Sequence, residues 1–464
     1  MTDRPATLRE LRQAHYQVLP VKAELRRNLI ARMRNRERLF PGIVGYDDTV
    51  LPQFENAILS GQDIILLGER GQAKSRIVRS LTSLLDEWTP VLDGVEIPEN
   101  PLAPISAQGR ATVRERGEDA PIRWMHRDDR YGEKLATPDI TIADLIGEVD
   151  PIKVAEGRYL SDELTIHFGL LPRVNRGIFA INELPDLAER IQVGLLNVLE
   201  ERDIQIRGHR VRLPLDVLLV ATANPEDYTN RGRIITPLKD RYGAQIRTHY
   251  PDDLGIEIAI MEQEASHLEM EGFRVGVPIY MKEIIAEISH QARRSPDVNQ
   301  RSGVSVRASV SNYEAMLANA FRRALRLGET NVVPRISDLP FIVPSLQGKV
   351  EFEAMDERRE DRVLDKLING AVRAVFDRYF EIGDLDKIAL AFGAGLTIET
   401  GEAVAAGEYR ESAAKVPGLP DKTAALADDS EAARAAAMEF ILEGLHLHKK
   451  LNKVSIDGRS AYSA

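Results

Sequence analysis

Cysteine is absent from the 464 residues of this chain. A disulfide framework, a thiol nucleophile and a thiolate metal site are therefore excluded. Long apolar runs are also missing, since no stretch approaches the roughly 18 consecutive apolar residues that a membrane-spanning helix needs. The first ten residues, MTDRPATLRE, lack the apolar core of a secretory signal. These absences make the cytoplasm the expected compartment.

Positive charge is in deficit, because 61 lysines and arginines face 72 aspartates and glutamates, which gives a formal net charge of −11. This balance argues against a general binder of polyanions and disfavours a DNA helicase. What is present is the composition of an ordinary globular protein, with 43% hydrophobic and 29% charged residues. The length is enough for two or three domains with substantial cores.

Apolar strands alternate with helical segments in the first half of the chain. The sequence predicts strands at GQDIILLGE (61–69), GIFAIN (177–182) and VLLVATAN (217–224), and a hairpin at 204–213. Strands that alternate with helices indicate a parallel α/β sheet. Residues 90–140 are rich in proline, glycine and charge and show little periodicity, so we expect a long surface insertion there.

The second half of the chain, from about residue 252, has a helical pattern. Apolar residues recur at helical spacing through 361–382, which implies a packed face. Residues 408–430 are predicted to be a linker, and Met438, Ile441, Leu442 and Leu445 predict a last amphipathic helix.

The stretch GERGQAKS, residues 68–75, has the features of a phosphate-binding loop. Such a loop needs inward-pointing backbone N–H groups, a lysine for the β- and γ-phosphates and a hydroxyl for Mg²⁺. Gly68, Gly71, Lys74 and Ser75 fit, whereas Ala73 stands where a second signature glycine is usual. An ordinary glycine-rich turn is the alternative, but the buried strand before the loop and the helix after it disfavour that alternative.

Polar residues end the two later strands. A P-loop enzyme places a carboxylate near Mg²⁺ and a base near the attacking water at the end of a neighbouring strand. Asn182 and Glu183 occupy that place, and Asn224 ends the third strand as an amide able to orient water. Each signal is weak alone, since strands often end in polar residues and Asn224 precedes a proline. Their positions relative to the loop give them weight.

Together these residues resemble the AAA+ ATPases of the MoxR and magnesium-chelatase I-subunit branch, over about residues 40–345. The order of motifs carries the resemblance: IVGYDDTVLPQFENAILSG (43–61), GERGQAKS, LIGEVDPIKVAEG (145–157), LLPRVNRGIFAINE, LLNVLEERDIQIRG, VLLVATANPED, LKDRYG (238–243) and SVRAS (305–309). The implied fold is a P-loop AAA+ parallel-sheet domain with a helix-2 insertion and a pre-sensor hairpin, then an α-helical lid and a helical extension. The implied boundaries are 1–38 for an N-terminal helical segment, 39–251 for the nucleotide-binding domain, 252–348 for the lid and 349–464 for the extension.

The resemblance implies ATP and Mg²⁺ as cofactors and assigns roles by position. Glu183 would be the base, Asn224 the water-orienting residue and Arg241 an arginine finger. Ser75 and Asn182 would serve Mg²⁺, Asn182 through water. The nucleotide-binding residues would be Ile43, Val44, Gly45, Gly68, Glu69, Arg70, Gly71, Gln72, Ala73, Lys74, Ser75 and Arg307. The alternatives for the two arginines are a surface ion pair for Arg241 and packing within the lid for Arg307.

An arginine finger supplied by a neighbouring subunit implies a ring, expected to be a hexamer, that remodels a protein client. The chain lacks the metal-binding motif of a von Willebrand A domain, so a partner with that domain is expected in trans. Asn182 replaces the usual acid, and hydrolysis is expected to be slow. Three alternatives stay open: the ATPase subunit of a magnesium chelatase, a nucleotide-dependent assembly scaffold, and a sigma-factor activator, disfavoured because GAFTGA is absent.

Overall fold

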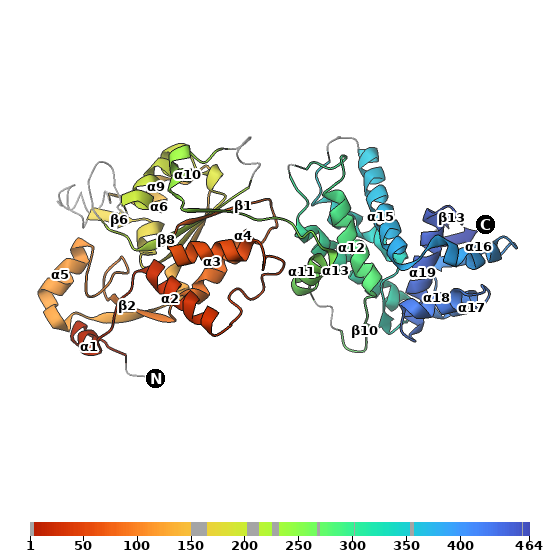
Figure 1. The fold of residues 1–464 in the computed structure, drawn as a ribbon, viewed down its shortest axis with the longest axis horizontal. Helices are drawn as coiled ribbons and strands as arrows, with labels where there is room; N and C mark the ends of the chain where they lie inside the picture. Colours follow the sequence, from red (N-terminus) through yellow and green to blue (C-terminus); the bar gives the residue numbers. More distant parts are fainter. Residues whose placement is uncertain are drawn as a thin grey trace. The chain divides into compact units, whose positions relative to one another are not determined.

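The computed structural model describes residues 4–149, 165–201, 213–224, 232–266, 270–300, 302–352, 357–456 and 458–464. The chain forms two compact units, Met1–His249 and Tyr250–Ala464. Figure 1 shows both, with the colours running along the sequence. Each unit is described by itself.

A parallel sheet organises the first unit. Its strands are β4 (Tyr131–Leu135), β7 (Gly177–Asn182), β8 (Val217–Ala223), β1 (Ile64–Leu67) and β9 (Ala244–Arg247), in that spatial order. Every pairing between neighbours in this sheet is parallel. The predicted α/β fold class is therefore confirmed, and the three predicted strands correspond to β1, β7 and β8.

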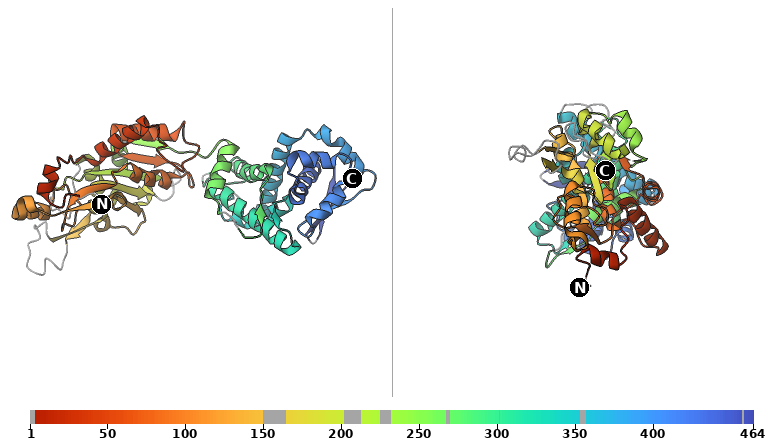
Figure 2. Two further views of the ribbon diagram at one scale, coloured as in Figure 1. Left: turned by 90° about the horizontal axis from the view of Figure 1, so that it is seen from below. Right: turned by 90° about the vertical axis from the view of Figure 1, so that its left-hand side faces the viewer.

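Helices cover both faces of this sheet (Figures 1 and 2). One face packs against α2 (Val21–Arg34), α3 (Val50–Ser60) and α4 (Lys74–Ser80), and the other against α9 (Glu189–Glu201) and α10 (Thr236–Arg241). Side chains alternate along a strand, so Ile64 and Leu66 enter the first core while Ile65 enters the second. Shorter helices in this unit are α1 (Leu8–Gln13), α6 (Ile142–Leu145) and α8 (Leu170–Arg173).

The stretch 90–140 is more than a surface insertion. It contains α5 (Ala107–Arg116), and its β3 (Ile122–His126) pairs antiparallel with β2 (Trp88–Leu92). Its last strand, β4, joins the central sheet beside β7, so the insertion prediction is wrong for these residues. As an edge strand with the sequence YGEKL, β4 has no apolar run to reveal it.

Two features implied by the resemblance lie largely outside the described residues. Residues 204–212 of the predicted hairpin and 150–157 of the helix-2 insertion are not described. The described residues nearest the insertion form a small antiparallel pair, β5 (Gly147–Val149) with β6 (Ile166–Phe168).

The second unit is mainly helical. Its longer helices are α11 (Leu254–Glu264), α12 (Ile279–Ala292), α13 (Val306–Leu327), α15 (Glu357–Tyr379) and α19 (Glu431–Leu447). Shorter helices are α14 (Val343–Gln347), α16 (Asp386–Phe392), α17 (Ala406–Ala413) and α18 (Leu419–Leu426). The strands β12 (Ile398–Gly401), β14 (Arg459–Ser463) and β13 (Asn452–Ile456) form an antiparallel sheet, and β10 (Arg274–Val275) pairs with β11 (Asn331–Val332).

The predicted linker at 408–430 is wrong, because α17 and α18 occupy most of it. Tyr409 and Leu419 from these helices are buried in the core of the second unit. The segment is rich in alanine, a strong helix former that leaves only a weak apolar pattern. The predicted last helix is present as α19.

One core joins the helices on both sides of residue 348. Tyr280 of α12 stacks on Phe440 of α19 with ring centroids 4.5 Å apart and planes inclined by 11°. Gly444 of α19 lies against the ring of Phe376, where an added Cβ would come within 2.0 Å of a ring atom. Helix α19 is buried along most of its length, so it is the centre of this unit rather than an edge helix.

Buried polar groups reinforce the same junction. Glu439 of α19 accepts hydrogen bonds from the backbone N–H of Ser337 at 2.8 Å and from the hydroxyl of Tyr409. Asp338 forms an ion pair with Arg323 at 3.0 Å, and both side chains are almost fully buried.

Among the described residues no helix is long and apolar enough to span a bilayer.

Candidate nucleotide site

The candidate site lies at the carboxyl ends of β1, β7 and β8, where ligands bind in open parallel sheets. The loop after β1 turns through two left-handed residues, Gly71 with φ 76° and Ala73 with φ 54°. Gly68 starts the loop in a place with no room for a side chain, because an added Cβ would lie 1.9 Å from Oγ1 of Thr248. The loop therefore turns tightly, with Ala73 in a conformation that favours glycine.

Side chains beneath the loop hold it in this path. The hydroxyl of Tyr46 donates to a backbone oxygen of the loop, that of Gln72, at 3.0 Å, and lies 2.8 Å from the carbonyl of His249. Thr248 donates to the side-chain oxygen of Gln72 at 2.6 Å. Burial raises the pKa of Tyr46, so its hydroxyl keeps its proton. Tyr46 and Thr248 were not predicted from the sequence. Tyr46 lies inside the motif 43–61, where nothing distinguishes it from its neighbours, and Thr248 lies outside every motif.

Lys74 connects the loop to the third strand. Its ammonium group donates to the backbone carbonyl of Glu69 and to Oδ1 of Asn224, both at 2.7 Å, and also to the carbonyl of Gly68. Only 7% of Lys74 is exposed. A buried ammonium group at the mouth of a glycine loop is suited to a phosphate anion.

Asn224 in turn contacts Glu183. Its amide nitrogen donates to Oε2 of Glu183 at 2.6 Å. Glu183 directly follows β7 with a left-handed φ of 55°, and its backbone N–H donates to Oγ1 of Thr222 at 3.2 Å. Three residues predicted from separate motifs therefore form one chain of hydrogen bonds, Lys74–Asn224–Glu183.

Asn182 ends β7 beside a carboxylate that the sequence did not reveal. Its amide nitrogen donates to Glu133 of β4, and its oxygen accepts from the hydroxyl of Thr222 at 3.3 Å. Glu133 also forms a two-contact ion pair with Arg79 of α4, at 2.7 and 2.9 Å. Burial alone would raise the pKa of Glu133, but the hydrogen bonds from Arg79, Tyr131 and Asn182 outweigh it, and the pKa lies below its ordinary value.

The other residues of the first unit that were predicted to bind the nucleotide differ in their exposure. Ile43 is buried, Val44 is half-buried and Gly45 has a left-handed φ of 80°. Ser75 and Glu69 are half-buried and Arg70 is exposed.

The two predicted arginines belong to different units of the chain. Arg241 of α10 donates to Glu200 of α9 at 2.8 and 3.1 Å, which is the surface ion pair of the alternative interpretation. Arg307, an exposed residue, lies in the first turn of α13 in the second unit, where the side chain of Ser305 caps the helix.

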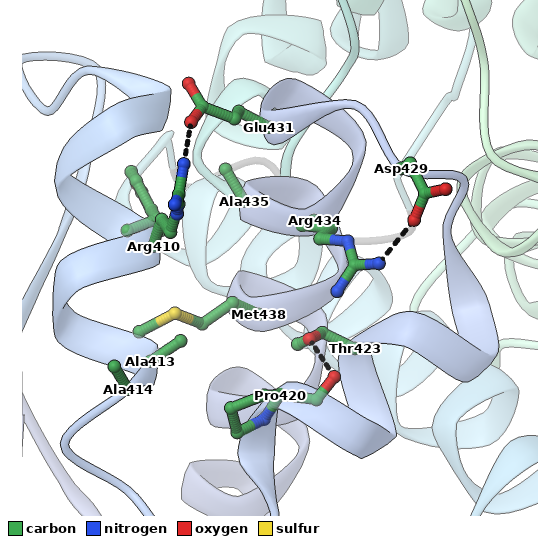
Figure 3. Close-up of a pocket in the computed structure, with 11 residues that line it drawn as sticks. Arg410, Ala413, Ala414, Pro420, Thr423, Asp429, Glu431, Arg434, Ala435 and Met438 are labelled. Carbon is green, nitrogen blue, oxygen red and sulfur yellow. Dashed lines mark hydrogen bonds and ion pairs between the residues drawn. The ribbon is translucent and has the colours of Figure 1, made fainter.

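A pocket of about 330 Å³ in the second unit contains none of the predicted site residues. Figure 3 shows Arg410 paired with Glu431 and Arg434 paired with Asp429 around Met438 and small side chains. Its cations are thus already satisfied by carboxylates of the same pocket.

The residues of the first unit fit a nucleoside triphosphate with its Mg²⁺. The loop with left-handed Gly71 and Ala73, the buried Lys74 and the hydroxyl of Ser75 are the groups that a triphosphate needs. The carboxylate of Glu183 and the amides of Asn182 and Asn224 provide the oxygen atoms that Mg²⁺ and its water prefer, and the carboxylate of Glu133 contacts the amide of Asn182.

Comparison with known proteins finds relatives over about half of the chain. The Sigma-54 interaction domain matches residues 155–238. The magnesium-chelatase 38 kDa subunit of Cereibacter sphaeroides is 28% identical over 242 residues, which cover 49% of this chain and 64% of that protein. The chloroplastic magnesium-chelatase subunit ChlI-1 of Arabidopsis thaliana is 26% identical over 233 residues, covering 49% of this chain and 51% of that protein.

The chain thus spans about half to just under two thirds of the length of these relatives. A solved structure described as the complex between subunits BchI and BchD of magnesium chelatase covers 70% of this chain and is covered to 98%. Its TM-score is 0.36 and its identity 18%, so it adds nothing to the assignment. The ordered motifs, the parallel sheet with its glycine loop and the sequence relatives all make the chain similar to AAA+ ATPases of the magnesium-chelatase I-subunit branch.

Proposed function

We propose that this chain binds ATP with Mg²⁺ at the carboxyl ends of β1, β7 and β8 and hydrolyses the nucleotide. The observation that carries the proposal is the hydrogen-bonded chain Lys74–Asn224–Glu183. In it the residues proposed to bind phosphate, to orient water and to act as the base are in direct contact. Bound Mg²⁺ would neutralise charge on the phosphates. Ser75 and Asn182 would hold it, Asn182 through water.

Each residue of the chain has a separate task in this proposal. Lys74 binds the β- and γ-phosphates, Glu183 accepts the proton of the attacking water, and Asn224 orients that water. Because Asn182 lacks the charge of the usual acid, we expect turnover to be slow but real.

We further propose that the active form is a ring, a hexamer, that remodels a protein client. Arg241 of one subunit would act as a finger at the nucleotide of the next, since charge develops on the γ-phosphate during cleavage. The matching relatives are named subunits, which supports work with partners. A separate protein with a von Willebrand A domain is the partner that we propose. The client is not identified.

Two alternatives have specific support. The names of the relatives favour the ATPase subunit of a magnesium chelatase, which would stimulate Mg²⁺ insertion into protoporphyrin when partner subunits are added. Asn182 favours an assembly scaffold that binds ATP but barely hydrolyses it. The matched Sigma-54 interaction domain does not lead us to propose a sigma-factor activator, because the chain contains no GAFTGA sequence.

Steady-state ATP hydrolysis by the purified chain tests the proposal. We expect Lys74→Ala to lose nucleotide binding and Glu183→Gln to keep binding while turnover falls by roughly 10²-fold or more. The control is Lys366→Ala, which removes a lysine that is 72% exposed in the second unit. If the wild-type chain hydrolyses ATP no faster than Glu183→Gln, the ATPase proposal is wrong.

Size measurement with ATP, with ADP and without nucleotide separates the motor from the scaffold. A motor would change its oligomeric state between the ATP-bound and ADP-bound forms and would release phosphate continuously. A scaffold assembles with ATP and stays assembled with little phosphate release.

A further inference from the structure

The strand β4 places a carboxylate against the one amide that departs from the family pattern. In the register of the sheet, Glu133 lies opposite Ala180, and the amide nitrogen of Asn182 donates to the Glu133 carboxylate. A carboxylate can only accept, so the nitrogen of Asn182 must face Glu133. The amide oxygen then faces the hydroxyl of Thr222, 3.3 Å away.

An aspartate at position 182 could not make this contact. Two ionised carboxylates would meet at hydrogen-bond distance, and one of them would have to take up a proton. Asn182 and Glu133 are therefore a matched pair with one neutral and one charged member. The negative charge that the family pattern places at position 182 is present in this chain, but on the neighbouring strand.

The ion pair with Arg79 does not fully neutralise the charge of Glu133. Arg79 contacts both carboxylate oxygens, yet its side chain is 64% exposed while that of Glu133 is 19% exposed. Water screens an exposed guanidinium, so Arg79 offsets the charge of Glu133 only in part. The hydroxyl of Tyr131 completes the contacts at 3.1 Å.

We propose that Glu133 supplies the negative charge that favours Mg²⁺ at the nucleotide site, with Asn182 as the neutral link between them. This inference rests on the nucleotide-binding function proposed above. Glu133 is in this view a positioning residue, since it acts through Asn182. A merely structural role, in which Glu133 only anchors Arg79, is the competing explanation.

The two explanations predict different behaviour of Arg79 and Glu133. If the ion pair is only structural, Glu133→Gln and Arg79→Gln remove the same contact and have the same effect. If the charge of Glu133 acts on Mg²⁺, removing Glu133 weakens Mg²⁺ binding, and removing Arg79 leaves it unchanged or strengthens it.

The experiment measures binding of a fluorescent, non-hydrolysable ATP analogue to the full chain, first in EDTA and then across a Mg²⁺ titration. The readout is the Mg²⁺ concentration that gives half of the gain in affinity. The variants are Glu133→Gln, Arg79→Gln, Asn182→Asp and the double variant Glu133→Gln/Asn182→Asp. Circular dichroism verifies that each variant is folded.

We expect Glu133→Gln to raise the required Mg²⁺ concentration by about tenfold or more, with affinity in EDTA unchanged. Asn182→Asp alone should bring no gain, and the double variant should return toward wild type because the charge has moved to position 182. The inference would be overturned if Glu133→Gln left the Mg²⁺ requirement unchanged, or if Arg79→Gln raised it as much as Glu133→Gln does. It would also be overturned if Asn182→Asp alone lowered the Mg²⁺ requirement, or if the double variant did not return toward the wild-type value.

Failure of the inference can be told from failure of the proposed function. If the wild-type chain binds no nucleotide with or without Mg²⁺, both are wrong. If it binds and Mg²⁺ enhances the affinity equally in wild type and Glu133→Gln, only the inference is wrong. Should Glu133→Gln not fold, Arg79→Gln decides: an unchanged or lower Mg²⁺ requirement supports the inference, and a raised requirement overturns it.

Discussion

The side-chain nitrogen of Asn224 lies 2.6 Å from Oε2 of Glu183, so the proposed water-orienting residue directly holds the proposed base. Asn224 also accepts from Lys74 through its other side-chain atom at 2.7 Å. One amide thus sets the position of both the phosphate-binding cation and the base. Loss of this amide should therefore disturb the chemistry more than the binding.

The first prediction concerns Asn224→Ala. We expect turnover to fall by about 10²-fold, since both neighbours lose a fixed partner, while nucleotide affinity changes by only a few fold. Steady-state hydrolysis and nucleotide titration measure the two effects. Asn452→Ala, an exposed change in β13 of the second unit, is the control. A loss of affinity as large as the loss of turnover would contradict the assignment.

The second prediction uses the backbone of the loop. Ala73 has φ 54°, a left-handed conformation that costs an ordinary residue about 1–2 kcal/mol. Ala73→Gly should therefore stabilise the first unit by up to about 1 kcal/mol, because the greater freedom of glycine in the unfolded chain offsets part of the gain. Denaturant unfolding followed by tryptophan fluorescence reports it, since Trp88 and Trp124 both lie in this unit.

The matched control for that change is Ala414→Gly. Ala414 is the C-cap residue that follows α17 and has a right-handed φ of −62°, where glycine brings no relief. We expect this variant to destabilise the second unit slightly, as circular dichroism would report, and to leave the tryptophan signal of the first unit unchanged. Destabilisation of the first unit by Ala73→Gly would show that the loop is not strained at this residue.

The third prediction concerns acid sensitivity of the second unit. Burial would raise the pKa of Glu257, but the neighbouring ring of His290, hydrogen bonds from Arg293 and Ser309 and the charge of Arg293 lower it from an ordinary value of 4.5 to about 2. Because the folded pKa is depressed, the resulting stability is fully present above about pH 4.5. It is lost as the pH falls toward 2, and the loss amounts to about 3 kcal/mol.

Glu257→Gln tests this directly. At pH 7 the variant should be less stable by a few kcal/mol, because Arg293, whose side chain is only 11% exposed, loses its charged partner. The difference in unfolding free energy between wild type and variant should decrease as the pH falls from 4.5 to 2. Unfolding followed by circular dichroism measures this difference, with the exposed Glu411→Gln as a control. A difference that does not depend on pH would refute the assignment.

The fourth prediction tests the shared core of the second unit. Phe440→Ala should cost about 3–5 kcal/mol, because it removes a buried ring stacked on Tyr280. The helical signal in circular dichroism should then melt earlier, while tryptophan fluorescence from the first unit keeps its midpoint. Leu390→Ala, at a side chain that is 75% exposed, should change neither signal. If only the residues after 348 melted early, the core would not be shared.

The fifth prediction separates the two interpretations of Arg241. If it is an arginine finger, Arg241→Ala should lower turnover by about 10³-fold, whereas Glu200→Gln, which only removes its surface partner, should not. Mixing Arg241→Ala with Lys74→Ala should restore some activity, since each supplies what the other lacks in a ring. Equal and small effects of the two single changes would favour the surface ion pair.

The sequence predicted the parts of the site that lie on buried strands. Central strands such as β7 are continuous apolar runs, and the residues that follow them, Asn182 and Glu183, must emerge at one edge of a parallel sheet. Glu133 escaped because it lies on an edge strand with one neighbour and no apolar run, inside a stretch that reads as a loop. Its role depends on the register with β7, which a single sequence does not contain.

Tertiary packing also explains why helices form where the sequence predicted a linker. The alanine-rich α17 and α18 carry little amphipathic pattern and are held by their contacts with α19. The roles of Lys74, Glu183, Asn224, Arg241 and Arg307 stay predictions, for which the geometry of the first three offers direct support.

The buried position of α19 has a consequence for how the protein is made. A ribosome releases residues 431–447 only after all the other helices of the second unit, yet these residues form its centre. The first unit can close its sheet during synthesis, because β9 ends at Arg247. The second unit completes its core only once α19 has been made, because α15, α17 and α18 all pack against that helix.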